Sequence, residues 1–193
     1  MNKHLNLALA AVALSGAFAV PAFAQNAVAG GSMSKDPMVG GAPMDSSKNV
    51  IQNAVISKDH TILVKLVKDA GLAQTLEGPG PFTVFAPTNE AFSKLPAATV
   101  AAVQKPENKQ LLTSILTYHV VADRLDSKAL VQQINDGNGT ATLKTIDGED
   151  LKASLDGGKI VLIDAKGGKS VVTIADVYQS NGVIHVIDTV LMP

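Results

Sequence analysis

The sequence contains no cysteine and no tryptophan, and aromatic residues make up only 4% of its 193 residues. Without cysteine the chain forms no disulfides, has no thiolate nucleophile and offers no thiolate ligand to zinc or to an iron–sulfur cluster. The scarcity of aromatic rings removes most of the material for stacking on bases or sugars. The chain therefore depends on a packed apolar core for its stability.

Charge is also scarce, because Asp, Glu, Lys and Arg together make up 17% of the sequence. The 16 basic and 17 acidic residues give a formal net charge of -1. Proteins that bind nucleic acid need a basic patch for the phosphate backbone, and this composition does not supply one. Nucleic acid is therefore excluded as an expected partner.

Residues 1–24 have the pattern of an export signal peptide. Lys3 precedes an apolar stretch over residues 5–20, which closes on the small-residue sequence Ala22-Phe23-Ala24. We expect cleavage after Ala24 and a periplasmic, extracellular or cell-surface location. An uncleaved anchor is the alternative, but no second apolar run of membrane length follows, so no stable membrane insertion is expected after cleavage.

Residues 25–47 are rich in Gly, Ala, Ser, Met and Pro and show no sustained period, which predicts a flexible tether. Met33, Met38 and Met44 are potential copper(I) ligands, since thioether sulfur is a soft donor. Their wide spacing instead favours incidental composition. The sequence thus predicts one ordered domain over residues 48–193.

Apolar residues recur at helical spacing through the first part of this domain and at alternating spacing through the last. Helices are expected near residues 50–55, at 62–70 with Gly71 as the stop, after Pro106 as far as 118–119, and from an Asp126 cap through Ile134. A short apolar strand is expected at 82–86. From residue 140 the pattern alternates, with Gly-containing turns at 147–148, 156–158 and 167–168. The predicted class is α+β, in which the early strand joins a sheet formed by the late hairpins.

Signatures of catalysis, cofactors and metals are missing from the sequence. There is neither a Gly-x-Ser-x-Gly elbow nor a His-Glu-x-x-His helix. His60, His119 and His185 are too dispersed for their spacing to indicate a metal cluster. His185 alternates with Val183 and Ile187 on one strand face, which predicts a hydrogen-bonded core histidine. No cofactor and no metal are expected.

Three segments together resemble the fasciclin-like domain family. They are TVFAPTNEAF at residues 83–92, the Tyr118-His119 pair within ILTYHVV, and SNGVIHVIDTVLMP at residues 180–193. The resemblance covers the chain from Asn49 onward. It implies a helix cluster packed against a β-wedge or sandwich of mostly antiparallel strands, and a secreted, non-enzymatic adhesion module.

The first and last of these motifs also make physical sense as scaffold. Pro87 ends a strand, and Thr88 or Asn89 can cap the helix that follows. Asn181-Gly182 is expected to form a turn with positive φ. The full set of expected structural residues is Thr83, Phe85, Pro87, Thr88, Asn89, Phe92, Asn181, Gly182, His185 and Asp188. Asp188 is expected to accept hydrogen bonds from a nearby backbone group or hydroxyl.

In animal relatives, integrin contact is attributed to a Tyr-His segment and to an Asp-Ile pair before the last strand. The resemblance transfers this contact role to Tyr118-His119 and to Asp176-Val177, where Val replaces Ile. The alternative is that Tyr118 and His119 pack in the core at a helix end. Because the signal peptide looks bacterial, integrin itself is not the expected natural partner.

The sequence thus favours an exported adhesion or matrix-interaction module that binds a protein or polysaccharide. Carriage of a small apolar ligand, lipid- or pigment-like, between helices and sheet is the alternative. A hydrolase built on Tyr118, His119 and either Asp176 or Asp188 ranks last, because no nucleophile motif supports it. The identity of the partner and the oligomeric state stay open.

Overall fold

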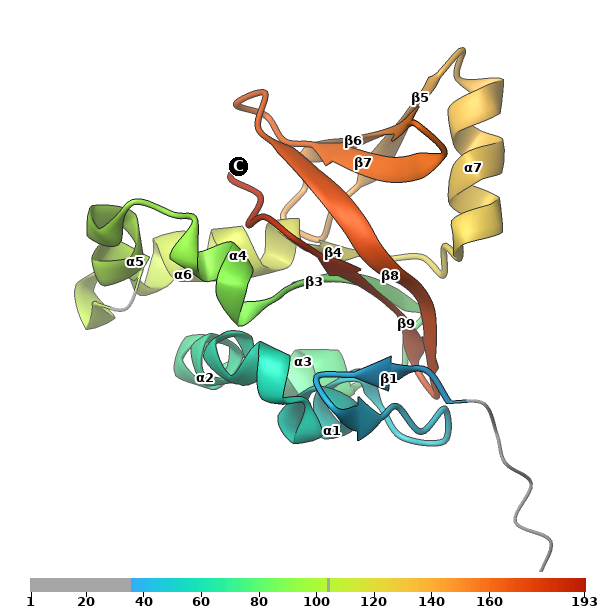
Figure 1. Cartoon of the computed structure of the whole chain (residues 1–193). Coiled ribbons are helices and arrows are strands. Elements are labelled where there is room, and N and C mark those ends of the chain that lie inside the picture. The colour runs from blue at the N-terminus through green and yellow to red at the C-terminus, as the bar shows by residue number, and fades with distance from the viewer. Residues whose placement is uncertain (1–35, 104) are drawn as a thin grey trace, which may run out of the picture. The chain divides into compact units, whose positions relative to one another are not determined.

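A computed structural model describes residues 36–103 and 105–193 (Figure 1). The predicted signal peptide lies outside these residues. The helices of the described part are α1 (Val50–Ile56), α2 (Thr61–Ala70), α3 (Ala73–Glu77), α4 (Asn89–Ser93), α5 (Ala97–Val103), α6 (Lys109–Tyr118) and α7 (Ser127–Asp136), with the 3-10 turns η1 (Lys58–His60) and η2 (Pro106–Asn108). The strands are β1 (Met38–Val39), β2 (Ala42–Pro43), β3 (Phe82–Pro87), β4 (Val120–Val121), β5 (Thr140–Lys144), β6 (Asp150–Asp156), β7 (Lys159–Ile163), β8 (Lys169–Gln179) and β9 (Gly182–Ile187).

Seven strands form the main sheet, in the order β4-β3-β9-β8-β7-β6-β5. All neighbouring pairs are antiparallel except β3 and β9, which run parallel. The early strand therefore enters the late sheet, as predicted, and lies beside its last strand. Val121 bridges Thr145, and Ile146 donates a backbone hydrogen bond to Val120, so the two edges of the sheet meet. The α+β class and the mostly antiparallel wedge are confirmed.

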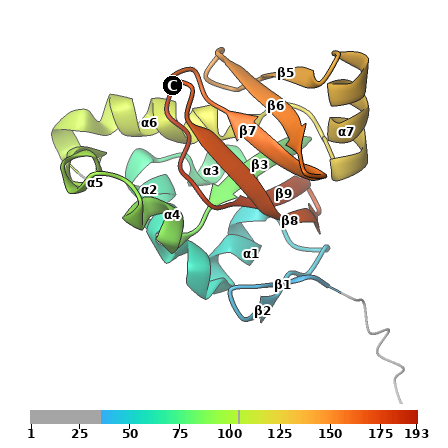
Figure 2. The ribbon, with the colours of Figure 1, turned by 45° about the horizontal axis from the view of Figure 1, so that its top comes forward.

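Two apolar cores lie on either side of β3 and β9 in the described part of the chain. The helical core lies between these strands and helices α1 to α6, whereas the barrel core lies inside the curled β5–β8 sheet, closed by α7 (Figures 1 and 2). Ile184 of β9 packs in the helical core, and Phe85 of β3 packs in the barrel core. The two central strands therefore form the junction of the cores.

Local sequence signals set several of the helix ends. Thr88 caps α4 by accepting a hydrogen bond from the Ala91 N–H (3.2 Å), and Asp126 caps α7 in the same way. Gly71 ends α2 in the left-handed conformation with φ 78°, which glycine adopts without steric cost. These three ends agree with the sequence prediction.

The predicted flexible tether is wrong for the part that the structure describes. Residues 38–43 form the β1–β2 hairpin, whose two turn residues, Gly40 and Gly41, both have positive φ. Val39 and Met44 are buried in the helical core. The glycines that made this segment look like a linker form a tight turn, so the ordered domain begins before residue 48.

Candidate functional site

The Tyr118-His119 pair lies where α6 ends, and its two side chains enter different cores. Tyr118 is fully buried in the barrel core. Its hydroxyl donates to the Asp150 carbonyl (3.3 Å) and accepts from the Ala165 N–H (3.1 Å). Burial raises the pKa of Tyr118 above its ordinary value. Tyr118 thus fastens β6 and the β7–β8 turn to the end of α6.

His119 points the other way, into the helical side of the junction, and is 2% exposed. Its Nδ1 donates to the Ile115 carbonyl (2.7 Å), which leaves Nε2 to accept from the Leu191 N–H (3.1 Å). Burial lowers the pKa of His119 to about 4, so the ring is neutral at pH 7. Two apolar cavities, of about 10 and 30 Å³, border the ring.

Asp176 and Val177 lie at the irregularity of β8, where the register with β9 shifts. Asp176 has φ 60°, and its carboxylate accepts from the N–H (2.6 Å) and the hydroxyl (2.5 Å) of Ser127 at the start of α7. Val177 is fully buried in the helical core. Both side chains expected to contact a partner therefore take part in the internal packing and hydrogen bonding of the domain.

Three of the four predicted contact residues are thus inaccessible in this structure: Tyr118, His119 and Val177. A partner reaches them only if the domain rearranges. Tyr118 and His119 are buried because the end of α6 lies between the two cores, and Val177 is buried because it faces the helical core from β8. Binding itself stays a prediction, but the contact surface has to lie elsewhere or include Asp176 alone.

His185 is a fully buried core residue, as predicted. Its Nε2 donates to the Leu125 carbonyl (2.8 Å), and its Nδ1 accepts from the Asp176 N–H (3.4 Å). The ring stacks on Phe85, with 5.7 Å between the ring centroids. Burial lowers the pKa of His185. The ring therefore joins β9 to β3, to the β8 irregularity and to the loop before α7.

The first motif is also used as scaffold. The Thr83 hydroxyl donates to the Asp123 carbonyl (2.6 Å) and accepts from the Leu125 N–H (2.8 Å). The Asn89 side chain donates to the Lys58 carbonyl (2.9 Å). Two further members of the motif, Pro87 and Phe92, are buried. These contacts tie β3 and α4 to the segments around them.

The β8–β9 turn consists of Ser180 and Asn181, and Gly182 is the first residue of β9, paired with Gln179. Neither Asn181 nor Gly182 has the positive φ expected for a turn at this pair. The Asn181 side chain accepts from the Val50 N–H (3.1 Å) and donates to the Leu76 and Gly78 carbonyls (2.7 and 3.0 Å). A Cβ on Gly182 would lie 2.1 Å from the Phe82 carbonyl oxygen. The motif is explained by side-chain bonding and by the close approach of β3 and β9.

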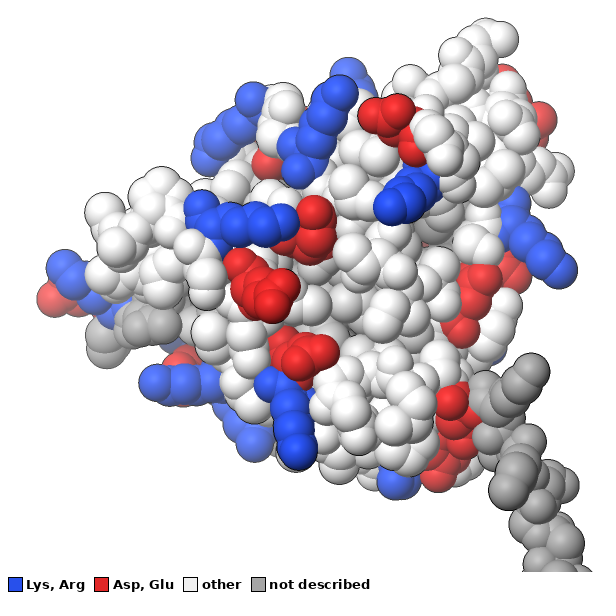
Figure 3. Space-filling view, viewed as in Figure 1, with Lys and Arg blue, Asp and Glu red and all other residues white. Residues whose placement is uncertain are grey.

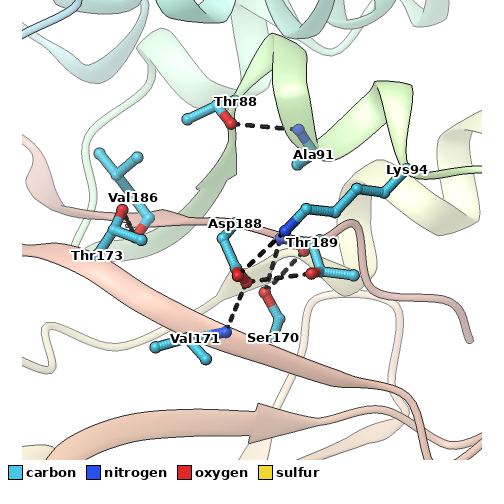
Figure 4. A network of polar contacts seen from close by, with 9 residues as sticks. All are labelled: Thr88, Ala91, Lys94, Ser170, Val171, Thr173, Val186, Asp188 and Thr189. Atoms are coloured by element: carbon cyan, nitrogen blue, oxygen red, sulfur yellow. Dashed lines mark hydrogen bonds and ion pairs between the residues drawn. The ribbon is translucent and has the colours of Figure 1, made fainter.

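Asp188 follows β9 and accepts hydrogen bonds, as predicted (Figure 4). Its carboxylate accepts from the Val171 N–H (2.8 Å) and the Thr189 hydroxyl (3.1 Å), and pairs with Lys94 at 3.2 Å. Burial by itself would raise the pKa of Asp188, but these bonds outweigh it and lower the pKa. The carboxylate thus extends the β8–β9 pairing beyond the last strand.

These positions do not converge on a catalytic centre. Both ring nitrogens of His119 and of His185 are engaged with the backbone, so neither ring is free to act on a nucleophile. Within residues 36–103 and 105–193 no group of three His, Asp or Glu side chains could hold a metal ion. The geometry gives no support to the hydrolase hypothesis.

In the same part of the chain, no helix has the length and apolar character needed to cross a membrane.

A surface feature that the sequence did not single out lies beside Asp176. Tyr178 is 41% exposed on β8, and the Arg124 guanidinium carbon lies 5.6 Å from the centre of its ring. The Tyr178 hydroxyl donates to Asp126 (3.4 Å). The local sequence does not indicate this contact, because Arg124 lies in the loop before α7, far along the chain from Tyr178.

On the face shown in Figure 3, acidic and basic side chains are interspersed.

An open apolar groove of about 380 Å³ lies on the helical side of the domain. Residues of α2, α4 and α5 and of the α4–α5 connection line it: Ile62, Phe92, Ser93, Leu95, Ala97, Val100 and Ala101. Phe92 and Leu95 also line the smaller of the two cavities beside His119. Those two side chains therefore separate the open groove from the enclosed cavity.

Comparison with known proteins identifies relatives of this architecture. A family model described as Fasciclin domain matches residues 58–193. The chain is 42% identical over 159 residues to Protein sll1483 of Synechocystis sp., covering 82% of this chain and 81% of that protein. It is 36% identical over 177 residues to Cell surface glycolipoprotein MPB83 of Mycobacterium bovis, covering 88% of this chain and 68% of that protein.

A solved structure has the same fold. It is a FAS1 domain pair from the insect cell adhesion molecule Fasciclin I, matched with a TM-score of 0.66 at 23% sequence identity. The match covers 76% of this chain and 51% of that chain. This chain therefore spans about half of the matched structure, and the likeness concerns the fold.

Proposed function

Because this chain belongs to the fasciclin domain family, we propose that it is an exported adhesion module that binds a protein or polysaccharide partner without catalysis. The family match and the cell-surface location named for the mycobacterial relative support an extracellular role. The observation that carries the proposal is the use of the motif residues as scaffold. Because the polar groups of the motifs are engaged in hydrogen bonds within the domain, they are not available for chemistry on a substrate. The residues that contact other molecules are then those on the surface.

We place the contact at Tyr178 and Arg124. Tyrosine and arginine are over-represented among residues that dominate binding energy at protein interfaces. Tyr178 presents its ring on strand β8, and the Arg124 guanidinium already lies against that ring, so little side-chain freedom is lost on binding. Asp126, bonded to the Tyr178 hydroxyl, adds an acceptor at the edge of the same patch.

Retention of the full chain on envelope and matrix fractions of the producing cells tests this proposal. We expect Tyr178→Ala and Arg124→Ala each to lower retention about tenfold or more, as loss of a hot-spot side chain does. Leu111→Ala, at a 43% exposed site on α6, is the matched control and should bind like the wild type. Protease treatment of the envelope and periodate treatment of the matrix distinguish a protein partner from a polysaccharide.

Two results would count against the proposal. Unchanged surface attachment and aggregation after deletion of the gene would contradict an adhesion function. Full retention of both patch variants, with a wild type that does bind, would leave adhesion standing and refute the position of the contact.

Carriage of a small apolar ligand is a second candidate function, and the open groove favours it. Its volume of about 380 Å³ falls within the range of small-molecule sites. The two cavities beside His119 are too small, since each has room for only one or two water molecules. Protein purified from the producing cells without extractable ligand or visible absorbance would argue against carriage.

A further inference from the structure

The segment after β9 crosses both cores and is fastened by side chains. Val190 packs in the helical core, Leu191 in the barrel core, and Met192 against the helical core. The Leu191 N–H donates to His119 Nε2 (3.1 Å), and the Met192 N–H donates to the Asp164 carboxylate (3.0 Å). We call residues 189–193 the strap.

The strap closes the smaller cavity beside His119. Val190 and Met192 form part of its wall, together with apolar side chains from the helices: Leu66, Phe92, Leu112, Ile115 and Leu116. On the far side of Phe92 lies the open groove of about 380 Å³. Movement of the strap away from the helices would expose this lining to solvent.

The strap depends on the protonation state of His119. The neutral ring accepts from Leu191 because its one proton is on Nδ1, bonded to Ile115. A proton on Nε2 would face the Leu191 N–H, and two donors cannot bond to each other. The charged group that faces the ring from the packed elements is Asp164, in the β7–β8 turn. The helices and the strap itself present apolar side chains to it.

We propose that residues 189–193 form an acid-sensitive strap: protonation of His119 breaks its bond to Leu191, releases the strap and opens the apolar lining beneath it. Release needs no movement of β9, because β9 is held by its ladders to β3 and β8. The device does not depend on which partner the module binds.

The direction of the pH response follows from the buried state of the ring. The pKa of His119 is about 4 with the strap closed and rises toward the ordinary 6.5 when the ring meets water. The closed strap is therefore fully favoured above pH 6.5 and loses this advantage as the pH falls to 4. These two values give a shift toward the open form of about 30-fold at pH 5.

Amide hydrogen exchange on the full chain, followed by NMR, tests the proposal. Protection factors of the Leu191 and Met192 amides report opening of the strap, and that of Val186 reports opening of β9. Between pH 7 and pH 5 we expect strap protection to fall about 20-fold. Val186 exchanges only on wider unfolding, so it should stay better protected than the strap at both pH values. Equal protection of the strap and Val186 at pH 5, or no loss of protection in the strap, would overturn the proposal.

Two variants assign the response to one ring. His119→Gln supplies an acceptor that does not titrate, so strap protection should be the same at pH 7 and pH 5. His185→Gln is the matched control, because His185 bonds to Leu125 and Asp176 rather than to the strap, and it should keep the wild-type response. A full pH response in His119→Gln would refute the proposal.

If His119→Gln does not fold, an NMR titration of the histidine ring signals in the wild-type protein tests whether His119 controls the strap. The midpoint of the His119 signal should coincide with the midpoint of strap opening. Midpoints separated by more than about one pH unit would overturn the assignment.

Discussion

Removal of the Asp176 side chain separates a structural role from a contact role. In Asp176→Ala, Ser127 loses the acceptor for its N–H and its hydroxyl, and the new residue keeps φ near 60°. We assign about 2 kcal/mol to the two bonds at this half-buried site and about 1 kcal/mol to alanine in the left-handed region. Asp176→Ala should thus lower the free energy of unfolding by about 3 kcal/mol.

Guanidinium denaturation followed by circular dichroism at pH 7 measures this loss, and three variants divide it. Asp176→Gly should lose about 1 kcal/mol less than Asp176→Ala, because glycine adopts positive φ freely. Asp176→Asn keeps one acceptor and should cost about 1 kcal/mol. Ser127→Ala removes only the hydroxyl bond and should cost about 1 kcal/mol as well.

Two results would refute these assignments. If Asp176→Ala unfolds within about 0.5 kcal/mol of the wild type but loses its retention on the envelope, Asp176 is a contact residue and not a fastening for α7. Equal stability of the alanine and glycine variants would refute the strain assigned to this position.

Three further predictions concern acid, close approach and the surface. The domain should lose stability as pH falls from 6.5 toward 4, because burial lowers the pKa of three histidines that must stay neutral in the fold: His60, His119 and His185. His119 alone accounts for about 3 kcal/mol, measured by denaturation at pH 7 and pH 4. Gly182→Ala should cost at least about 3 kcal/mol, seen in the denaturation midpoint, because its Cβ would meet the Phe82 carbonyl at 2.1 Å. Lys94→Ala should change the same midpoint by less than about 1 kcal/mol, since its pair with Asp188 is exposed.

Much of the fold could be predicted because local signals agree with the final structure. The caps at Thr88 and Asp126, the stop at Gly71 and the change from helical to alternating periodicity each depend on residues a few positions apart. Such signals survive folding because the interactions they describe are local.

The features that escaped prediction depend on partners far along the chain. Asp176 bonds to Ser127, 49 residues away, and Asn181 bonds to Val50, 131 residues away. The hairpin at residues 38–43 is held by the burial of Val39 and Met44, which composition alone does not reveal. These contacts join residues that are far apart in the sequence, so they cannot be predicted from the local pattern of residues around either partner.

The Tyr118-His119 pair shows why a motif that identifies a fold need not mark its contact surface. Successive residues on a helix point about 100° apart, so a pair at the end of α6 can enter two cores at once. Tyr118 holds the barrel side and His119 the helical side, and both are buried as a result. Contacts in this chain are therefore to be sought among exposed residues such as Tyr178 and Arg124, which belong to none of the three motifs.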